Sequence, residues 1–423
     1  MRFFLIFSFC CFTVLSQRQY FDHKFLTIRT SLENEKVLKE LAQKLDFHRF
    51  SSRLNGKNLI LLKPHEIEKT KDLLKKNGIT FEIKDVGYIK YSGKGIDYLS
   101  TRGDFNISTY NDFDLQMESL DSLTQKYKRK VKKIVLGETF EKRPLVALKL
   151  GFESKNSKPS IFMNAGIHAR EWITSSSILW LINELLSNES YKEFLKDLDI
   201  YIAPMWNPDG YQFSRTKERN WRKNRRFYED PEDEEICVGI DLNRNYPFKW
   251  KHQKCSNENG SGPVGGSELE TQALMKFLTK NKDQLKGYID FHSFGEHILY
   301  PFAYKKHIYP TNVEELKLIG KKMQKAIATV RDTEYDLINI ADGMYPAPGS
   351  TADYAKSIGI RYTYGFELVP DGKHGIDGFN VPDTEIEPTG REVLAALRVL
   401  FERIIRDDEK TSLNQKTKTS MHL

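Results

Sequence analysis

Two spacings of hydrophobic residues in the first hundred positions predict a small mixed domain. Short apolar or alternating runs, which are typical of strands, occur at 24–29, 47–51, 58–62 and 79–86. Apolar residues three and four positions apart predict helices over 33–45 and 66–76. The resulting order, β-α-β-β-α-β, predicts an open sandwich with two helices on one face of a sheet.

From Tyr110 onward strand and helix patterns alternate, which predicts a second and larger domain. Strand patterns lie at 132–137, 144–150, 160–164, 198–204, 287–291 and 361–368. Helix patterns lie at 111–127, 173–187, 268–280, 312–331 and 385–405. This alternation is typical of one α/β domain whose mixed sheet carries helices on both faces. The polar segment from Asp407 to Leu423 predicts a frayed tail.

The first residues have the pattern of a secretory signal. Met1-Arg2 precedes a mostly apolar run from Phe3 to Leu15, and the small residue Ser16 follows it. The run is too short to span a bilayer comfortably, and no later stretch reaches its length. We therefore expect cleavage after residue 16 and secretion, with a membrane anchor as the alternative.

The net charge of +7 is not spread over the whole chain. Residues 17–102 hold 18 Lys and Arg against 11 Asp and Glu, whereas residues 103–423 hold 46 against 47. The larger domain therefore has no general attraction for nucleic acid or an anionic membrane. A basic run at 215–226 leaves one rival hypothesis open, which is a polyanion-binding module.

The connector between the two domains is rich in glycine and basic residues. Residues 87–104 contain Gly87, Gly93, Gly95 and Gly103 together with Lys90, Lys94 and Arg102. This composition predicts a flexible target for trypsin-like proteases, and the alternative is a plain interdomain linker.

Cys237 and Cys255 are the two cysteines outside the signal-like segment. In a secreted protein, an even number of cysteines suggests a disulfide. In a cytosolic protein, the same two residues would be free buried thiols.

One stretch combines the residue types and the spacing of a metal site. Asn164 to Trp172 reads Asn-Ala-Gly-Ile-His-Ala-Arg-Glu-Trp and joins a predicted strand to a predicted helix. His168 and Glu171 can turn to the same side of this junction and share one metal ion. Imidazole nitrogen and carboxylate oxygen form a zinc-type ligand set, and catalytic zinc needs a third protein ligand and an open position. His292, at the end of the strand 287–291, is the candidate third ligand.

Two acidic residues of the same domain also call for a chemical explanation. Asp241 lies in a loop, and its carboxylate is suited to orient a ligand imidazole. Glu367 lies in a strand of apolar and aromatic residues, where an unpaired carboxylate would be costly. Glu367 therefore needs a partner or a function.

Together these stretches resemble the secreted zinc procarboxypeptidases of the carboxypeptidase A/B family. The motifs that carry the resemblance, in their joint order, are Gly166–Trp172, Asn207–Tyr211, Trp221–Arg225, Asp241–Asn245, His292-Ser293, Tyr345 and Phe366–Leu368. The resemblance implies a signal peptide at 1–16, an activation prosegment at 17–102, a catalytic domain at 103–406 and a polar tail at 407–423. The implied fold is a mixed, eight-stranded α/β sheet flanked by helices, preceded by a small α+β open sandwich.

The same resemblance implies roles for individual residues in removing the last residue of a peptide. The implied ligands of one zinc ion per chain are His168, Glu171 and His292. The implied general base is Glu367, and Arg222 is the implied partner of the oxyanion. The implied substrate contacts are Asn243 and Arg244 on the C-terminal carboxylate, Tyr345 closing over it, and Arg170 in the next subsite.

The resemblance also implies partners and processing. Substrates would be the C-termini of peptides and proteins, and a trypsin-like protease would cut near Arg102 to release a latent prosegment. Cys237 and Cys255 match the disulfide loop of the family. We expect a secreted monomer. An inactive relative that only binds peptides is a further hypothesis, although the implied zinc ligands and base are all present.

The sequence gives conflicting indications about which C-terminal residue of a substrate would be preferred. Ala352 stands where A enzymes carry a large aliphatic residue and B enzymes carry Asp, and the other matched pocket positions are Ala303, Ile340, Ala347 and Gly365. These small or apolar residues favour hydrophobic or aromatic C-terminal residues. Asp290, however, stands where relatives usually have Ser. If its carboxylate reaches the pocket, it would favour Lys and Arg instead.

Overall fold

The structure, a computed structural model, describes residues 24–29, 48–51, 57–62, 67–85, 104–230, 236–255, 257–371 and 378–420. The chain divides into two compact units between Lys94 and Gly95. The predicted helix at 33–45 and the connector with Arg102 lie outside the described residues.

The N-terminal unit contains a four-stranded antiparallel sheet in the order β2-β3-β1-β4. Its strands are β1 (Lys24–Arg29), β2 (His48–Ser51), β3 (Lys57–Leu62) and β4 (Phe81–Asp85). Helix α3 (Ile67–Lys76) connects β3 to β4 and buries Ile67, Thr70 and Leu74, which the helical period places on one face. The four strands and the second helix of the predicted sandwich are thereby confirmed.

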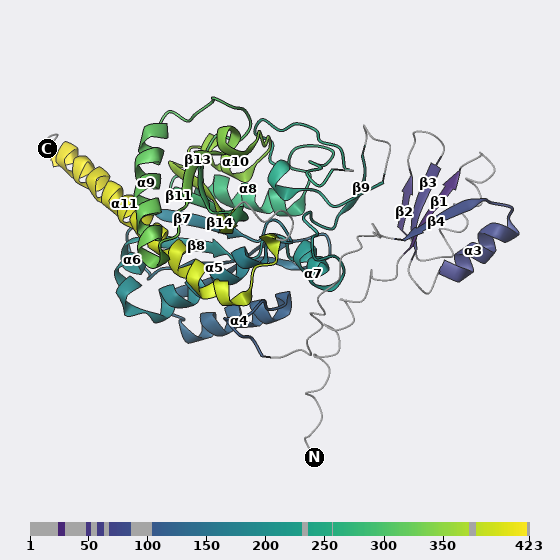
Figure 1. Cartoon of the computed structure of the whole chain (residues 1–423), viewed down its shortest axis with the longest axis horizontal. Coiled ribbons are helices and arrows are strands. Elements are labelled where there is room, and N and C mark those ends of the chain that lie inside the picture. Colours follow the sequence, from purple (N-terminus) through teal and green to yellow (C-terminus); the bar gives the residue numbers. More distant parts are fainter. Residues whose placement is uncertain are drawn as a thin grey trace, which may run out of the picture. The chain divides into compact units, whose positions relative to one another are not determined.

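The large unit is built on a mixed eight-stranded sheet in the order β13-β12-β14-β11-β7-β8-β6-β5 (Figure 1). Its strands are β5 (Val131–Glu138), β6 (Pro144–Leu150), β7 (Ser160–Ala165), β8 (Asp199–Ala203), β11 (Leu285–Gly295), β12 (His297–Tyr300), β13 (Asp336–Asn339) and β14 (Tyr362–Asp371). The central strands β14, β11, β7 and β8 run parallel, whereas β6 pairs antiparallel with both β8 and β5. This arrangement confirms the predicted fold class.

Helices connect the strands and cover the sheet. They are α4 (Phe113–Lys126), α5 (Trp172–Ser187), α6 (Lys192–Asp197), α7 (Pro208–Thr216), α8 (Leu269–Asn281), α9 (Val313–Arg331), α10 (Thr351–Ser357) and α11 (Ile386–Ser420). Short helical turns are η2 (Glu189–Tyr191), η3 (Leu242–Arg244), η4 (Ile340–Met344) and η6 (Asp383–Glu385). A small hairpin pairs β9 (Phe227–Glu229) with β10 (Ile236–Val238).

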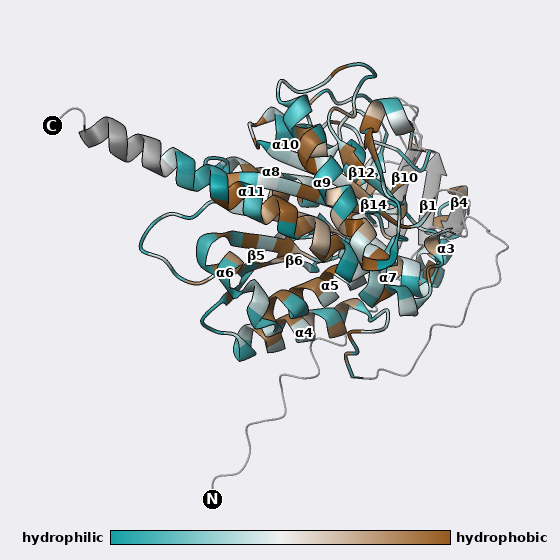
Figure 2. Cartoon of the chain, turned by 60° about the vertical axis from the view of Figure 1, so that its left-hand side comes forward, coloured by the Kyte–Doolittle hydropathy of each residue, from teal (hydrophilic) through white to brown (hydrophobic). Residues whose placement is uncertain are grey.

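Different helices cover the two faces of the large sheet. In β7, Ile161, Met163 and Ala165 belong to one core together with residues of α5, α9 and α11. Phe162 belongs to a second core together with residues of α8 and α10. The alternation follows from the two-residue period of a strand. In Figure 2 hydrophobic residues, coloured brown, gather where the helices meet the sheet.

The C-terminal segment differs from its prediction. The polar stretch after Asp407, expected to be a frayed tail, continues α11 as far as Ser420 (Figure 1). Neither Pro nor Gly interrupts the helix after Arg391. Asp407 also accepts hydrogen bonds from Arg403 Nε at 3.1 Å and from the Tyr362 hydroxyl, which fastens this turn to β14. Among the described residues, no helix is both long enough and apolar enough to cross a membrane.

Candidate functional site

The candidate residues meet where β7, β11 and β14 end. These three strands are parallel neighbours, so their carboxyl ends open at one edge of the sheet. The register places His292 of β11 directly beside Glu367 of β14. Phe291 and Phe366 face the core with α5, so their neighbours His292 and Glu367 face the side covered by α8 and α10.

The first two candidate ligands lie in the turn from β7 into α5. Gly166 opens this turn with a φ of 68°, a conformation that side chains disfavour, and a Cβ there would lie 3.0 Å from Met205 Sδ. His168 follows, and Glu171 is the N-cap residue of α5. The Glu171 side chain makes no capping hydrogen bond to α5, and its oxygens instead lie against His168 Nδ1 and the Ser293 N–H.

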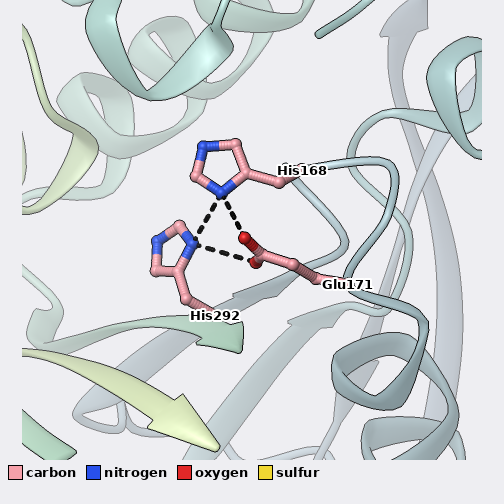
Figure 3. Close-up of side chains that lie close together, drawn as sticks. All are labelled: His168, Glu171 and His292. Atoms are coloured by element: carbon pink, nitrogen blue, oxygen red, sulfur yellow. Dashed lines mark hydrogen bonds and ion pairs between the residues drawn. The ribbon is translucent and has the colours of Figure 1, made fainter. Parts of the chain in front are cut away.

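His168, Glu171 and His292 converge on one point (Figure 3). His168 Nδ1 lies 2.8 Å from Glu171 Oε1 and 3.1 Å from His292 Nδ1, and His292 Nδ1 lies 3.3 Å from Glu171 Oε2. All three side chains are buried. The structure therefore brings the three predicted ligands together.

The cluster fits a zinc ion. Zinc bonds of about 2.0–2.1 Å in tetrahedral geometry separate neighbouring ligand atoms by about 3.3 Å, close to the three separations seen here. Two imidazole nitrogens that face each other at 3.1 Å need a proton or a cation between them. Two His and one Glu form a known ligand set of catalytic zinc.

Asp241 supports the cluster from outside. Its Oδ1 lies 3.1 Å from His168 Nε2. Its Oδ2 accepts a hydrogen bond from Arg222 Nε at 3.0 Å and forms an ion pair with Arg222 Nη2 at 2.9 Å. Burial alone would raise the pKa of Asp241, but Arg222 and His168 hold that pKa well below its usual range. Asp241 thus fixes both an imidazole and a guanidinium, as its position in the sequence indicated for the imidazole.

Asp290 is buried, and both of its carboxylate oxygens have partners within the protein. The residue is 1% exposed. Its Oδ2 lies 2.9 Å from His292 Nε2 and accepts a hydrogen bond from the Thr351 hydroxyl, while its Oδ1 accepts one from Asn164 Nδ2 at 3.2 Å. The sequence analysis missed Thr351 and Asn164. Asn164 could have been noticed in the sequence, because it is an amide that directly follows three apolar residues of the strand.

The surroundings of the cluster shift the pKa values of Glu171 and Glu367 in opposite directions. Burial would raise the pKa of Glu171, but His168 and His292 hold it below the usual range. Burial, partly offset by His292, raises the pKa of Glu367 to about 8. Burial would lower the pKa of His292, but Asp290 and Glu171 hold it well above its usual value. A bound metal ion would therefore displace a proton from this imidazole.

The residues expected to hold a substrate carboxylate lie around η3 and η4. Arg244 is buried and donates from Nη1 to the Asn243 carbonyl at 2.8 Å. Its guanidinium carbon lies 5.8 Å from the centre of the Tyr345 ring. Tyr345 is 48% exposed, and few large hydrophobic side chains of the described residues are as exposed. Asn243 is half-buried, and its Nδ2 lies 3.0 Å from His292 Nε2.

Arg170 has a partner that sequence reasoning missed. Its guanidinium lies 4.3 Å from the centre of the Phe379 ring, and its Nη1 donates to Glu258 at 2.8 Å. Glu258 follows the disulfide between Cys237 and Cys255, which the structure contains as expected. No motif linked Arg170 to Glu258, since they lie 88 residues apart.

Two of the small pocket residues are connected by a backbone hydrogen bond, and the third lies next to a partner of one of them. The backbone N–H of Ala347 donates to the carbonyl of Ala303 at 2.7 Å. The N–H of Ala303 donates to Asp353, the residue after Ala352, at 2.7 Å. Ala303, Ala347 and Ala352 are all buried. Asp290 is in register with Gly365, another of the pocket positions.

The basic run at 215–226 is largely engaged within the protein. Arg222 pairs with Asp241, and Arg226 donates to Glu268 at 2.8 Å. Arg225 is buried, with its guanidinium carbon 3.5 Å from the centre of the Phe213 ring. These contacts argue against the hypothesis of a polyanion-binding surface.

Comparisons with known proteins agree with one another. The family model for zinc carboxypeptidase matches residues 117–396, and the model for the carboxypeptidase activation peptide matches residues 26–86. Mast cell carboxypeptidase A of Mus musculus is 30% identical over 427 residues, covering 96% of this chain and 100% of that protein. Carboxypeptidase B2 of Homo sapiens is 35% identical over 298 residues, covering 68% of this chain and 69% of that protein. The crystal structure of thrombin activatable fibrinolysis inhibitor matches at 25% identity with a TM-score of 0.67, covering 91% of this chain and 100% of that one.

Proposed function

Because this chain belongs to the zinc carboxypeptidase family and carries the activation peptide of that family, we propose that His168, Glu171 and His292 form its catalytic zinc centre. The reaction is hydrolysis of the last peptide bond of a peptide or protein. The observation that carries the proposal is the convergence of these three ligand atoms beside Glu367 and Arg222.

Glu367 acts as general base and then as general acid. It accepts a proton from the attacking water and returns it to the leaving amine. Burial raises the pKa of Glu367, and a bound dication lowers it again. A pKa between the two limits suits both steps, since proton transfer is most efficient when the pKa lies near the working pH. Zinc, when bound, supplies Lewis acidity that polarises a carbonyl and lowers the pKa of water.

Arg222 stabilises the oxyanion that forms during attack. Asp241 fixes the Arg222 side chain through a hydrogen bond and an ion pair before substrate arrives. A cation that is already oriented in a buried site loses little energy to reorganisation during the reaction. Asn243 and Arg244 hold the free carboxylate of the substrate, Tyr345 closes over it, and the grip limits cleavage to the last residue.

The preferred C-terminal residue is hydrophobic or aromatic. Ala303, Ala347 and Ala352 are small, apolar and buried, which supports a pocket that accepts a large uncharged side chain. The alternative preference for Lys or Arg requires a free carboxylate at Asp290. The contacts of Asp290 with His292, Thr351 and Asn164 argue against that preference.

The protein is secreted as an inactive monomer and activated by proteolysis. Residues 1–16 are the signal, and a trypsin-like protease cuts near Arg102. Support comes from the basic connector, the disulfide and the matched activation peptide. Arg170, with Glu258, contributes to the next subsite.

The test is zinc content together with release of free amino acids after trypsin treatment. Peptides that differ only in a terminal Phe, Leu, Lys or Glu should be cleaved, with Phe and Leu preferred. No release by zinc-loaded, trypsin-treated protein would instead support an inactive peptide-binding relative. Preference for Lys would leave the carboxypeptidase activity intact and would overturn the proposed pocket.

A further inference from the structure

Both imidazoles of the cluster contact a buried carboxylate on the side away from the other ligands. Asp241 lies 3.1 Å from His168 Nε2, and Asp290 lies 2.9 Å from His292 Nε2. Asp290 and His292 are two residues apart on β11 and therefore lie on the same face of the sheet. The strand therefore allows the short contact between their side chains.

An ionised carboxylate can only accept hydrogen bonds, so its partner nitrogen must carry the proton. In neutral His292, the form that binds a metal ion, this assigns the proton to Nε2 and leaves a lone pair on Nδ1. His292 Nδ1 is the atom that faces His168 Nδ1 and Glu171 Oε2. Asp290 thus selects the tautomer of His292 that can bind a metal ion.

A second neighbour competes for the same nitrogen. Asn243 Nδ2 lies 3.0 Å from His292 Nε2, and an amide N–H2 can only donate. It would need Nε2 without a proton, and that tautomer cannot offer a lone pair at Nδ1. A hydrogen bond to an ionised carboxylate is the stronger of the two, so Asp290 determines the tautomer.

The neighbours of Asp290 hold it in place for this contact. Thr351 donates its hydroxyl to Asp290 Oδ2, and Asn164 donates to Oδ1. Thr351 also donates its backbone N–H to Asn243 Oδ1 at 2.8 Å. Asp290 is therefore locked by donors on both of its oxygens, and its carboxylate is not free to turn towards a substrate.

We propose that Asp290 is a positioning residue for zinc, which acts by fixing the tautomer and orientation of His292, and that it does not select basic C-terminal residues. The inference rests on the proposed zinc ligands. A carboxylate behind a ligand imidazole raises the basicity of that ligand, and loss of such a partner typically lowers metal affinity about 10–100-fold.

The experiment compares zinc loss from the purified full-length chain in four forms. These are the unmodified chain, Asp290→Asn, Asp290→Ser and Thr351→Val. Thr351→Val is the matched control, because it removes a donor to Asp290 but keeps the contact between Asp290 and His292. Release is followed with an excess of a chromogenic chelator, and thermal unfolding of the metal-free forms reports whether each variant folds.

Both Asp290 variants should release zinc about 10–100-fold faster, whereas Thr351→Val should stay within about 3-fold of the unmodified chain. The visible spectrum of cobalt-substituted Asp290→Asn should also shift, because the orientation of a ligand changes. A general loss of stability would lower the unfolding temperature of the metal-free variant. A shifted spectrum with an unchanged unfolding temperature therefore indicates a change at the ligand.

The outcomes separate this inference from the proposed function. If the unmodified chain does not hold one zinc ion, the proposed ligand set fails. If it holds zinc but Asp290→Asn releases it at the same rate, the inference fails and the ligand set stands. If Asp290→Asn abolishes the release of C-terminal Lys while the rate of zinc release is unchanged, Asp290 is a specificity residue and the inference is overturned.

Discussion

His292 and Glu367 are direct partners in the parallel register of β11 and β14. One is a candidate zinc ligand and the other the candidate base, so the pairing of two strands sets the distance between them. A shift of either strand by one residue would turn its functional side chain to the opposite face. The strands are held in register by the core residues that alternate with the two functional residues.

Replacing Glu367 by Gln should abolish most of the turnover and leave zinc binding intact. The amide keeps the size of the side chain but cannot accept a proton, so kcat should fall about 10²–10⁴-fold. Zinc content and peptide hydrolysis after trypsin treatment are the measurements. Substantial residual turnover would remove Glu367 from its role as base.

The acidic limb of the kcat/KM profile should report the same carboxyl group. Burial raises the pKa of Glu367 to about 8 from an ordinary value of 4.5, and a bound dication favours the carboxylate and lowers it. Activity should therefore fall with decreasing pH, with a midpoint between these two values. The profile is measured with zinc content checked at each pH. No titration in this interval would assign the base to another group.

Replacing Ala352 by Asp should shift preference towards terminal Lys and Arg. A carboxylate in the pocket pairs with a basic side chain, and it stays buried without a partner when the substrate ends in an apolar residue. The ratio of kcat/KM values should therefore change about 10–100-fold. The ratio of kcat/KM for peptides ending in Lys and Phe is the measurement. Ala352→Asn is the matched control, since it has the same size without the charge. An equal shift in both variants would attribute the effect to pocket shape.

Replacing Glu315 by Gln should lower stability at neutral pH. Glu315 of α9 lies 2.7 Å from Arg361 Nη2 and 2.8 Å from Arg403 Nη2 of α11. Burial would raise the pKa of Glu315, but the hydrogen bonds from Arg361 and its neighbours outweigh this and lower it to about 2. A lowered folded pKa gives stability that is present above about pH 4.5 and is lost as pH falls towards 2.

The expected loss for Glu315→Gln at pH 7 is about 1–2 kcal/mol in the free energy of unfolding, from urea titrations followed by fluorescence. The difference from the unmodified chain should shrink as pH falls below 4.5. Glu314→Gln is the control. Glu314 is exposed, and the ion pair that the structure shows for it is with Lys317. A constant difference at all pH values would contradict the assignment to this carboxylate.

Removing the disulfide with Cys237→Ala/Cys255→Ala should lower the free energy of unfolding by about 3 kcal/mol. The bridge closes a loop of 18 residues and restricts the unfolded chain. Urea unfolding with and without a reducing thiol is the measurement. The thiol should destabilise the unmodified chain by a similar amount and leave the double variant unchanged. If the thiol destabilises both proteins equally, its effect does not act through this bridge.

The strands that carry the site were predictable because they lie in the centre of the sheet. β7, β11 and β14 are buried on both faces and stand out as apolar runs ending in polar residues. The sequence analysis missed β12 and β13, which have four residues each and lie at one end of the sheet. Helix α10 has seven residues, too few to show a helical period.

Contacts between distant segments were the part of the site that sequence patterns did not reveal. The surroundings of Asp290 come from Asn164 and Thr351, which lie 126 and 61 residues away. The resemblance to the family placed Asp290 near the pocket. It did not indicate which residues donate hydrogen bonds to the Asp290 carboxylate. Only the register of β7, β11 and the start of α10 determines that.

The candidate ligands also differ greatly in their separation along the chain. His168 and Glu171 are three residues apart, but His292 lies 124 residues beyond His168. An unfolded chain offers only the local pair, and the third ligand arrives when β11 docks beside β7. Zinc bound by all three residues therefore acts as a reversible crosslink across the centre of the sheet. The zinc content of a preparation would thus measure the fraction of molecules whose central strands have assembled correctly.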